Sequence, residues 1–523
     1  MCYNNFVDTP DGGDRPGDDL IPGGFQGKVL YFMKRSAVIR YLSLSLIAAM
    51  VVSLVSACDK SSGDDAPDNG TETSAESVTE AEKPGPAFER EDNGGAVFTT
   101  YSSDRDFYRN YFFTDEQNGD AMNDALYNRD KLVEDYLGVK IEHILNGTIN
   151  DVMPSVQKTV MSGDDEFQLA LTHCYIGVSD MATKGYLYDW NDLNYCDYSQ
   201  KWWNQDCSEN LTVNGKNYYM VSDFVVPDMN CILFNKQMID EFSLENPYTL
   251  VDDGKWTLDK LSEMASKVTS DINGDGVFDI NDRYGLASPD DWYWCSFLHS
   301  SGIKVVSRND NGNYELSIGG ERAVSMVEKL DKLVNRSGDT FLYSYLYETD
   351  GTETLRISTG RCLFQVEAIF LMNTLRDSTV EYGILPYPKL DETQADYYST
   401  DWSGLMCIPK TVGNPDLVSK VCELLAYYSG DTALPAFYDL VLGEKLSRDE
   451  DSKRMLDVIF GSRIYDVGMS YFGGQPNCGS FFYTAPRLVI SQKSTDFASY
   501  YAKYEKGAQK EIEKFENTIA ELE

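Results

Sequence analysis

The feature that most limits how this chain can fold is an alternation of short apolar segments with amphipathic helices, which begins at Ala96. Strands separated by helices of this length are typical of βαβ units with a parallel sheet. A chain of 523 residues is long enough for more than one such core. We therefore predict an α/β fold whose two cores are joined by crossing strands, with a ligand cleft at their junction, where such sites preferentially form. The predicted strands are AVFTTY, VKIEHIL, FQLALTHCY, CILFNK, RCLFQVEAIF and GLMCIPK, and the chain is predicted to end in one long charged helix.

Charge excludes one class of partner. The formal net charge is −39. Residues 1–57 hold as many bases as acids, so the whole excess of negative charge lies in residues 58–523. Such a surface repels phosphate backbones, and nucleic-acid binding is therefore not expected.

A lipoprotein signal precedes the α/β pattern. Met33 opens MKRSAVIRYLSLSLIAAMVVSLVSAC, in which a basic start, an apolar stretch and small residues lead to Cys58. This order predicts a signal peptide over residues 33–57 and lipidation of Cys58. The alternative is a transmembrane helix that stays in place. Residues 1–32 lie upstream of a complete signal, so we interpret them as an extension from a mis-assigned start.

The segment after the predicted lipidation site cannot form a core. Residues 58–95 are rich in acids, and their first large apolar residue other than valine is Phe88. This composition predicts a disordered acidic tether. With a multiply acylated cysteine it would hold a globular body at the extracellular face of a membrane.

Histidine and cysteine usage argues against metal catalysis. There are only three histidines, His143, His173 and His299, and no CxxC pair or zinc spacing. We expect the cysteines beyond Cys58 to be mostly buried thiols, with Cys196–Cys207 as the candidate for a disulfide.

The run DINGDGVFDIND predicts a calcium site. An EF-hand-type loop places oxygen ligands at positions 1, 3, 5, 7, 9 and 12 and a glycine at position 6, which here is Gly276. Position 12 is aspartate rather than glutamate, which suits weak extracellular calcium binding. The alternative is a solvated turn without metal. A catalytic carboxylate pair is less favoured, because the ion accounts for these side chains. The predicted ligands are Asp271, Asn273, Asp275, the carbonyl of Val277, Asp279 and Asp282.

Several runs, in this order, carry a family resemblance. They are GYLYDWNDLNY, NGKNYYMVSDFVVPDMNCILFNKQMIDEF, NPYTLVDDGKWTLDKLSEMA, STGRCLFQVEAIF and EYGILPYPKLDETQADYY. Together they resemble the family 1, carbohydrate-type extracellular solute-binding proteins of bacterial ABC transporters. The resemblance implies a two-lobed, type II-like periplasmic-binding-protein fold that the chain crosses about three times. On that pattern lobe 1 takes residues 96–224 plus 384–430, and lobe 2 takes residues 225–383 plus 431–523.

Candidate ligand-binding residues lie where aromatic and polar side chains meet the predicted crossings. Aromatic rings can stack on the apolar faces of sugars. His173 and Tyr175 follow a strand at the carboxyl end, where open α/β sheets bind ligands. Glu367 is a carboxylate in an apolar run and needs a partner. The full set is Trp402, Glu367, Asp401, Trp292, Tyr293, Trp294, His173, Tyr175, Asp223 and Asp228.

The sequence thus favours a membrane-anchored, monomeric binding protein that captures a carbohydrate, expected to be an oligosaccharide, and delivers it to an ABC permease. A peptide or another polar solute is the alternative ligand. The chain lacks a nucleophile elbow, an HExxH motif and a Walker motif, so enzymatic activity is not expected. The alternative is a secreted, calcium-stabilised glycoside hydrolase. An adhesion or scaffold protein would be expected to show sequence repeats, and none is visible.

Overall fold

The computed structural model describes residues 85–343, 357–375, 378–446 and 449–522. All of them lie in one compact unit, Lys83–Glu523. The upstream extension 1–32, the signal peptide 33–57, Cys58 and most of the predicted tether lie outside the described residues. Among the described residues, no helix is both long enough and apolar enough to cross a bilayer.

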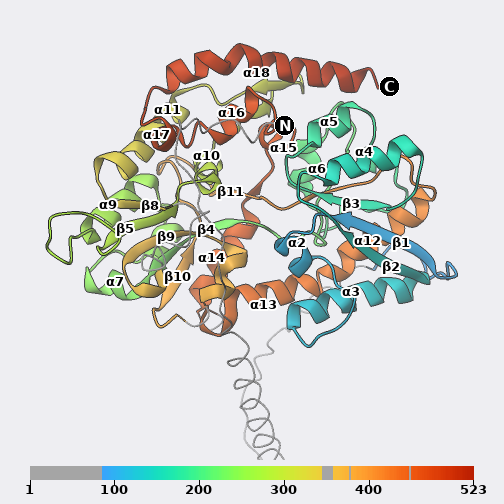
Figure 1. Cartoon of the computed structure of the whole chain (residues 1–523), viewed down its shortest axis with the longest axis horizontal. Coiled ribbons are helices and arrows are strands. Elements are labelled where there is room, and N and C mark those ends of the chain that lie inside the picture. The colour runs from blue at the N-terminus through green and yellow to red at the C-terminus, as the bar shows by residue number, and fades with distance from the viewer. Residues whose placement is uncertain (1–84, 344–356, 376–377, 447–448, 523) are drawn as a thin grey trace, which may run out of the picture. The chain divides into compact units, whose positions relative to one another are not determined.

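The first sheet contains the predicted strands nearest the start of the pattern (Figure 1). Its order is β12-β3-β1-β2, with β1, β2 and β3 parallel and β12 antiparallel to β3. The strands are β1 (Ala96–Ser102), β2 (Val139–Leu145), β3 (Leu169–Thr172) and β12 (Leu405–Cys407).

Helices pack on both faces of this sheet. Asp120 caps α3 by accepting from the amides of Met122 and Asn123, and Gly138 ends the helix in the left-handed region. Helix α12 packs against α3, while α4 contacts β3. The helices of this half are α2 (Asp106–Tyr111), α3 (Ala121–Leu137), α4 (Val152–Ser162), α5 (Val178–Thr183), η1 (Trp190–Asp192), α6 (Gln205–Leu211) and α12 (Pro415–Ser429).

The second sheet has the order β10-β4-β9-β5-β8. Strand β5 is parallel to β8 and β9, whereas β4 runs antiparallel to both β9 and β10. The expected parallel sheets are therefore interrupted by β4 and β12, which run opposite to the other strands of their sheets and lie next to the crossings. The strands are β4 (Asn230–Asn235), β5 (Tyr284–Pro289), β8 (Thr340–Tyr343), β9 (Cys362–Ala368) and β10 (Tyr382–Leu385).

Short helices and two small sheets complete the second half. The helices are α7 (Lys236–Glu241), α8 (Pro247–Asp252), α9 (Leu258–Val268), η2 (Trp292–Cys295), α10 (Ser296–Ser300), α11 (Glu321–Asp331), η3 (Lys332–Arg336), η5 (Ile357–Thr359), η6 (Ile369–Leu375) and α14 (Glu450–Gly461). A hairpin pairs β6 (Val306–Arg308) with β7 (Tyr314–Leu316), and β11 (Ser399–Thr400) pairs with β13 (Arg463–Ile464).

Two segments that run between the sheets pair with each other. The first leads into β4 and the second leads from β10 to β12. Met229 bridges Asp401, and the amide of Trp402 donates to the carbonyl of Asp228 over 2.7 Å. This pairing fixes the side chains of both segments at the junction of the two halves.

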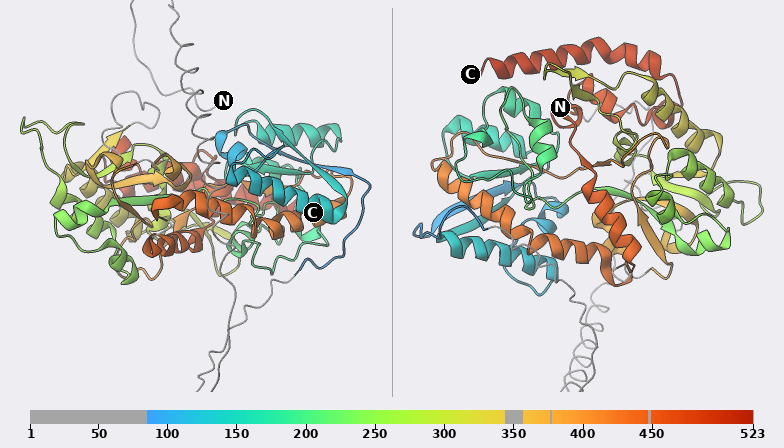
Figure 2. Two further views of the ribbon diagram at one scale, coloured as in Figure 1. Left: turned by 90° about the horizontal axis from the view of Figure 1, so that it is seen from below. Right: turned by 180° about the vertical axis from the view of Figure 1, so that it is seen from behind.

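The C-terminal region belongs to both halves. Helix α13 (Ala433–Leu446) contacts α3 and η6. Helix α18 (Phe497–Ala520) contacts α5 of the first half as well as α11 and β7 of the second, and Figures 1 and 2 show it lying over both. Residues 431–523 therefore do not pack on the second half alone. The remaining elements are α15 (Val467–Ser470), α16 (Cys478–Tyr483) and α17 (Leu488–Ser491).

Two local expectations are corrected. The end of the predicted tether is ordered, because Phe88 is buried between the rings of Tyr136 and Tyr195, and the amide of Glu91 donates to the Tyr136 carbonyl. No disulfide joins Cys196 and Cys207, since both are free thiols.

A buried carboxylate joins the 197–203 segment to α12. Glu423 accepts a hydrogen bond from each of two indole nitrogens, over 2.9 Å from Trp202 and 2.8 Å from Trp203, and another from the Asp197 amide. Burial raises the pKa of Glu423, and these donors oppose that shift.

Replacing Glu423 should test this anchor. Glu423→Ala leaves two buried indole N–H groups without an acceptor and is expected to lower the free energy of unfolding by about 2–5 kcal/mol. Glu423→Gln keeps one acceptor oxygen and should lower it by less. Urea denaturation measures both, and equal stabilities for the two variants would contradict the role given to the carboxylate.

Candidate functional site

A series of aromatic rings runs through the junction of the two halves. Tyr175 follows β3, Trp402 lies on the second crossing segment, and Trp292 begins η2. Residues Phe482 and Tyr483 of α16 join them. The ring centroids are 4.6 Å apart for His173–Tyr175, 5.4 Å for Tyr175–Tyr483, 5.3 Å for Tyr483–Phe482, 5.6 Å for Phe482–Trp402 and 5.0 Å for Trp402–Trp292.

Beside these rings lie buried polar atoms that have no hydrogen-bond partner among the described residues. Ser103 follows β1, and Thr172 ends the neighbouring parallel strand β3. Leu405 of β12 pairs with Thr172. The atoms are Ser103 Oγ, Thr172 Oγ1, Asp228 Oδ1, Asn230 Oδ1 and Ser403 Oγ.

These atoms need an explanation, because leaving a buried polar group unpaired costs about 1–3 kcal/mol. The five belong to strand ends and crossing segments that adjoin one another. Trp402 Nε1 and Asn230 Nδ2 both donate to Ser296 Oγ, which connects the unpaired groups to the ring series. The arrangement can pair with a ligand that carries several hydroxyl groups.

Two aspartates of the crossing segments differ in their surroundings. Asp401 is held by the Tyr465 hydroxyl over 3.0 Å and by the Ser403 amide over 2.9 Å. Asp228 is equally buried, and burial raises its pKa to about 7. Arg105 opposes this shift, and the negative charge of Asp401 adds to it.

His173 is a neutral member of the site. Burial, with a smaller contribution from the nearby charge of Arg105, lowers its pKa to about 3. Its Nδ1 lies 3.5 Å from the thiol of Cys174. A neutral imidazole in contact with Tyr175 can offer a hydrogen bond without carrying a charge.

Four of the predicted residues belong neither to the ring series nor to the polar groups beside it. Trp294 is fully buried and donates from Nε1 to the Pro289 carbonyl, so it belongs to the core. Tyr293 is also buried, although its ring stacks on Trp292 with centroids 4.1 Å apart.

The other two are carboxylates. Glu367 lies within β9, where it accepts from Gln365 Nε2 over 2.9 Å. Asp223 lines a small cavity of 220 Å³ that it shares with Arg463.

Some residues of the site were not among those predicted. Ser103 and Thr172 stand at carboxyl ends of parallel strands, and the rule that pointed to His173 could have found them. Asn230, Ser403, Phe482 and Tyr483 carried no sequence signal of this kind, because only the tertiary packing shows that they meet.

The acidic loop has turn geometry suited to its sequence. Gly276 has a φ of 80°, which favours glycine at that position. Asp271 accepts from the amides of Gly274 and Gly276, which lower its pKa. Asp282 is buried and accepts from the amides of Ile272 and Asp279. Among the described residues, no three side chains of metal-ligand type are arranged around one ion position.

Comparison with solved structures identifies the fold. No protein-family model matches the chain, and no curated protein matches it. In solved structures the same architecture is found in the two-lobed periplasmic binding proteins, and the α/β, two-lobed fold predicted above is confirmed.

For three of these structures, the alignment with this chain covers nearly the whole of the solved chain. A sugar transporter from Rhizobium etli, in an open conformation, is similar with a TM-score of 0.53 and 13% identity, over 82% of this chain and 99% of that one. The GacH receptor of Streptomyces glaucescens, solved unliganded and with acarbose, has a TM-score of 0.50 and 14% identity, over 78% of this chain and 98% of that one. UspC of Mycobacterium tuberculosis has a TM-score of 0.50 and 15% identity, over 77% of this chain and 100% of that one.

The raised pKa of Asp228 predicts a pH effect. Between about pH 4 and pH 7 the folded chain binds a proton at Asp228 that the unfolded chain does not, so this group makes stability fall as pH rises through that window. Asp228→Asn should match the parent near pH 4 and exceed its free energy of unfolding by about 2–4 kcal/mol at pH 8. Denaturation across this pH range is the measurement. The exposed Asp310→Asn is the control, and equal pH profiles for parent and Asp228→Asn would refute the assignment.

Proposed function

We propose that this chain is an extracellular, membrane-tethered binding protein that captures an oligosaccharide and delivers it to an ABC permease. The observation that carries the proposal is the set of five unpaired buried polar atoms beside the series of aromatic rings. A sugar offers both kinds of surface that this arrangement needs, apolar ring faces for Trp402 and Trp292 and hydroxyl groups for the unpaired atoms.

The fold supports a clamp rather than a catalyst. The GacH receptor, which shares the architecture, has been solved with acarbose. In a two-lobed protein the site lies where both halves contribute groups, so a solute can be held by closure and released by opening. The proposed chemistry is reversible binding, with no bond made or broken.

The proposals of a membrane tether and of a permease partner rest on the sequence. Lipidation of Cys58 would hold the body at the extracellular face, and the permease would receive the solute there. The protein would act as a monomer.

One buried histidine network resembles a catalytic triad in its order of groups. His299 contacts Thr400 Oγ1 over 2.9 Å and Asp466 Oδ2 over 3.2 Å, an order also found in nucleophile–base–acid triads. All three side chains are buried, and Asp466 also accepts from backbone amides, including that of Val305. A nucleophile must reach its substrate, so this network is structural.

Sugar binding is directly testable. Calorimetric titration with a panel of oligosaccharides should find one that binds and is recovered unchanged. Trp402→Ala should weaken that binding by about 2 kcal/mol, or roughly 30-fold, because it removes a ring central to the series. Phe278→Ala, at an aromatic side chain 54% exposed in the acidic loop, is the matched control and should bind as the parent does. Release of new reducing ends would overturn the proposal in favour of hydrolysis.

Calcium binding by the acidic loop is proposed on the spacing of its oxygen ligands and on the glycine at its sixth position. The ion would be held by the exposed Asn273 and Asp275, the half-buried Asp271 and Asp279, and the carbonyl of Val277, and Asp282 would close the loop. The ion would supply rigidity to the segment between α9 and β5.

Calcium should therefore raise the melting temperature, since a ligand that binds only the folded state stabilises it. Chelation should reverse the rise, and Asp275→Ala should abolish it. Asp310→Ala, at another exposed aspartate, should leave the response intact. An unchanged melting temperature on chelation would show that the loop is a turn without metal.

A further inference from the structure

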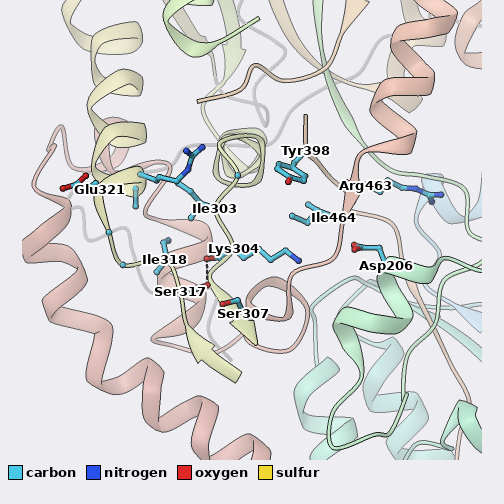
Figure 3. A pocket seen from close by; sticks show the side chains of 15 residues that line it. Asp206, Ile303, Lys304, Ser307, Ser317, Ile318, Glu321, Tyr398, Arg463 and Ile464 are labelled. Carbon is cyan, nitrogen blue, oxygen red and sulfur yellow. Dashed lines mark hydrogen bonds between the residues drawn. The ribbon is translucent and has the colours of Figure 1, made fainter. Parts of the chain in front are cut away.

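A cavity of about 690 Å³ lies apart from the aromatic series and has no role in the function proposed above. Figure 3 shows Lys304 extending into it, with Asp206 and Arg463 on one side, Tyr398 above, and Glu321 at the far edge. Arg322, at the start of α11, also lines it.

Its walls come from both halves of the molecule. Asp206 lies on α6 of the first half. The N-cap of this helix, Asn204, donates from its amide to the carbonyl of Val221, which also belongs to the first half. Lys304 lies between α10 and β6, in the connection from β5 to β8 of the second sheet. Lys304 Nζ reaches across to Asn210 Oδ1 over 3.0 Å, so the two walls already touch through one bond.

The charge of the lining contrasts with the rest of the chain. Three basic side chains, Lys304, Arg322 and Arg463, face two acids in a protein of net charge −39. Asp206 is already paired with the amide of Tyr465 over 3.1 Å and with Asn210 Nδ2 over 2.8 Å. Glu321 is exposed at the edge, as Figure 3 shows. Arg322 lies 3.9 Å from a carboxylate oxygen of Asp391, and Arg463 lies 3.9 Å from one of Asp401. Lys304 is therefore the lining base that has no ion pair among the described residues.

Several donors in the cavity remain available. Within the described part of the chain, the Lys304 ammonium group makes a single hydrogen bond, although it can donate three. Among the described residues, the hydroxyl groups of Tyr398 and Ser307 have no hydrogen-bond partner. The first turn of α11 adds backbone amides, because its N-cap, Gly320, has a φ of 143° and offers no side chain.

We propose that this cavity is a second ligand site, which binds a small solute carrying an oxyanion group, either a carboxylate or a phosphate. Lys304 supplies the unpaired charge, Arg322 and Arg463 can add N–H donors beyond those that face Asp391 and Asp401, and Tyr398 and Ser307 supply neutral donors. Since the walls come from both halves, the solute holds those halves in one arrangement. Its binding is therefore coupled to oligosaccharide binding, a consequence that rests on the function proposed above.

Thermal unfolding of the full chain in inorganic phosphate, succinate or sodium chloride at matched ionic strength tests the site. Phosphate, succinate or both should raise the melting temperature in a saturable way, and the comparison identifies the preferred oxyanion. Lys304→Gln removes the unpaired charge and should weaken that binding at least about tenfold. Ser307→Phe places a ring in the cavity and should abolish it. Lys510→Gln removes an equal charge from an exposed position of α18 and should bind as the parent does.

The outcomes separate the two proposals. Stabilisation no greater than that of chloride, or equal stabilisation of the parent, Lys304→Gln and Ser307→Phe, would overturn the second site whether or not a sugar binds. Saturable oxyanion binding that both variants impair supports it, even if every oligosaccharide fails. Where a sugar does bind, the oxyanion should change its dissociation constant about fivefold or more, and no change would overturn the coupling.

Discussion

The pairing of two crossing segments is the constraint on which the rest of the site depends. Met229 and Asp401 form a bridge, and the Trp402 amide donates to the Asp228 carbonyl. A backbone segment that passes from one sheet to another loses the hydrogen bonds that neighbouring strands would make with it. Here each crossing segment makes such backbone hydrogen bonds with the other. The same pairing forces Asp228 and Asp401 into one buried region, where their charges repel and only one of them has strong hydrogen-bond donors.

That arrangement explains why several unpaired polar groups lie together at the junction. Elsewhere, some buried polar groups form closed networks, as Glu423 does with two indoles and His299 does with Thr400 and Asp466. Others, such as Thr159 Oγ1 and Trp190 Nε1, also lack a partner among the described residues. At the junction, the unpaired groups stand on strand ends and crossing segments, where no neighbouring strand completes the pattern. Five such atoms on adjoining strand ends and crossing segments form the cluster expected where a ligand completes the hydrogen bonding.

Much of the fold was predictable from periodicity, and less of the site was. The strands and helices from Ala96 onward follow apolar patterns that local sequence carries, and Asp120 and Gly138 mark the ends of α3 where the rules for caps place them. The Trp292–Trp294 run could not be divided into surface and core, since η2 turns Trp294 into the interior while Trp292 faces Trp402. Phe482 and Tyr483 join the site only because α16 packs there, a contact across a long stretch of sequence that no local pattern encodes.

Helix α18 also limits how the two halves can move. It has 24 residues and is therefore about 36 Å long, and it cannot shorten without breaking its hydrogen bonds. Glu516 connects its far end to both sides, accepting from Asn214 at its carbonyl and from the Tyr314 amide at its carboxylate. Any change in the arrangement of the two halves must therefore keep this one rigid helix in contact with both, or break the contacts of Glu516.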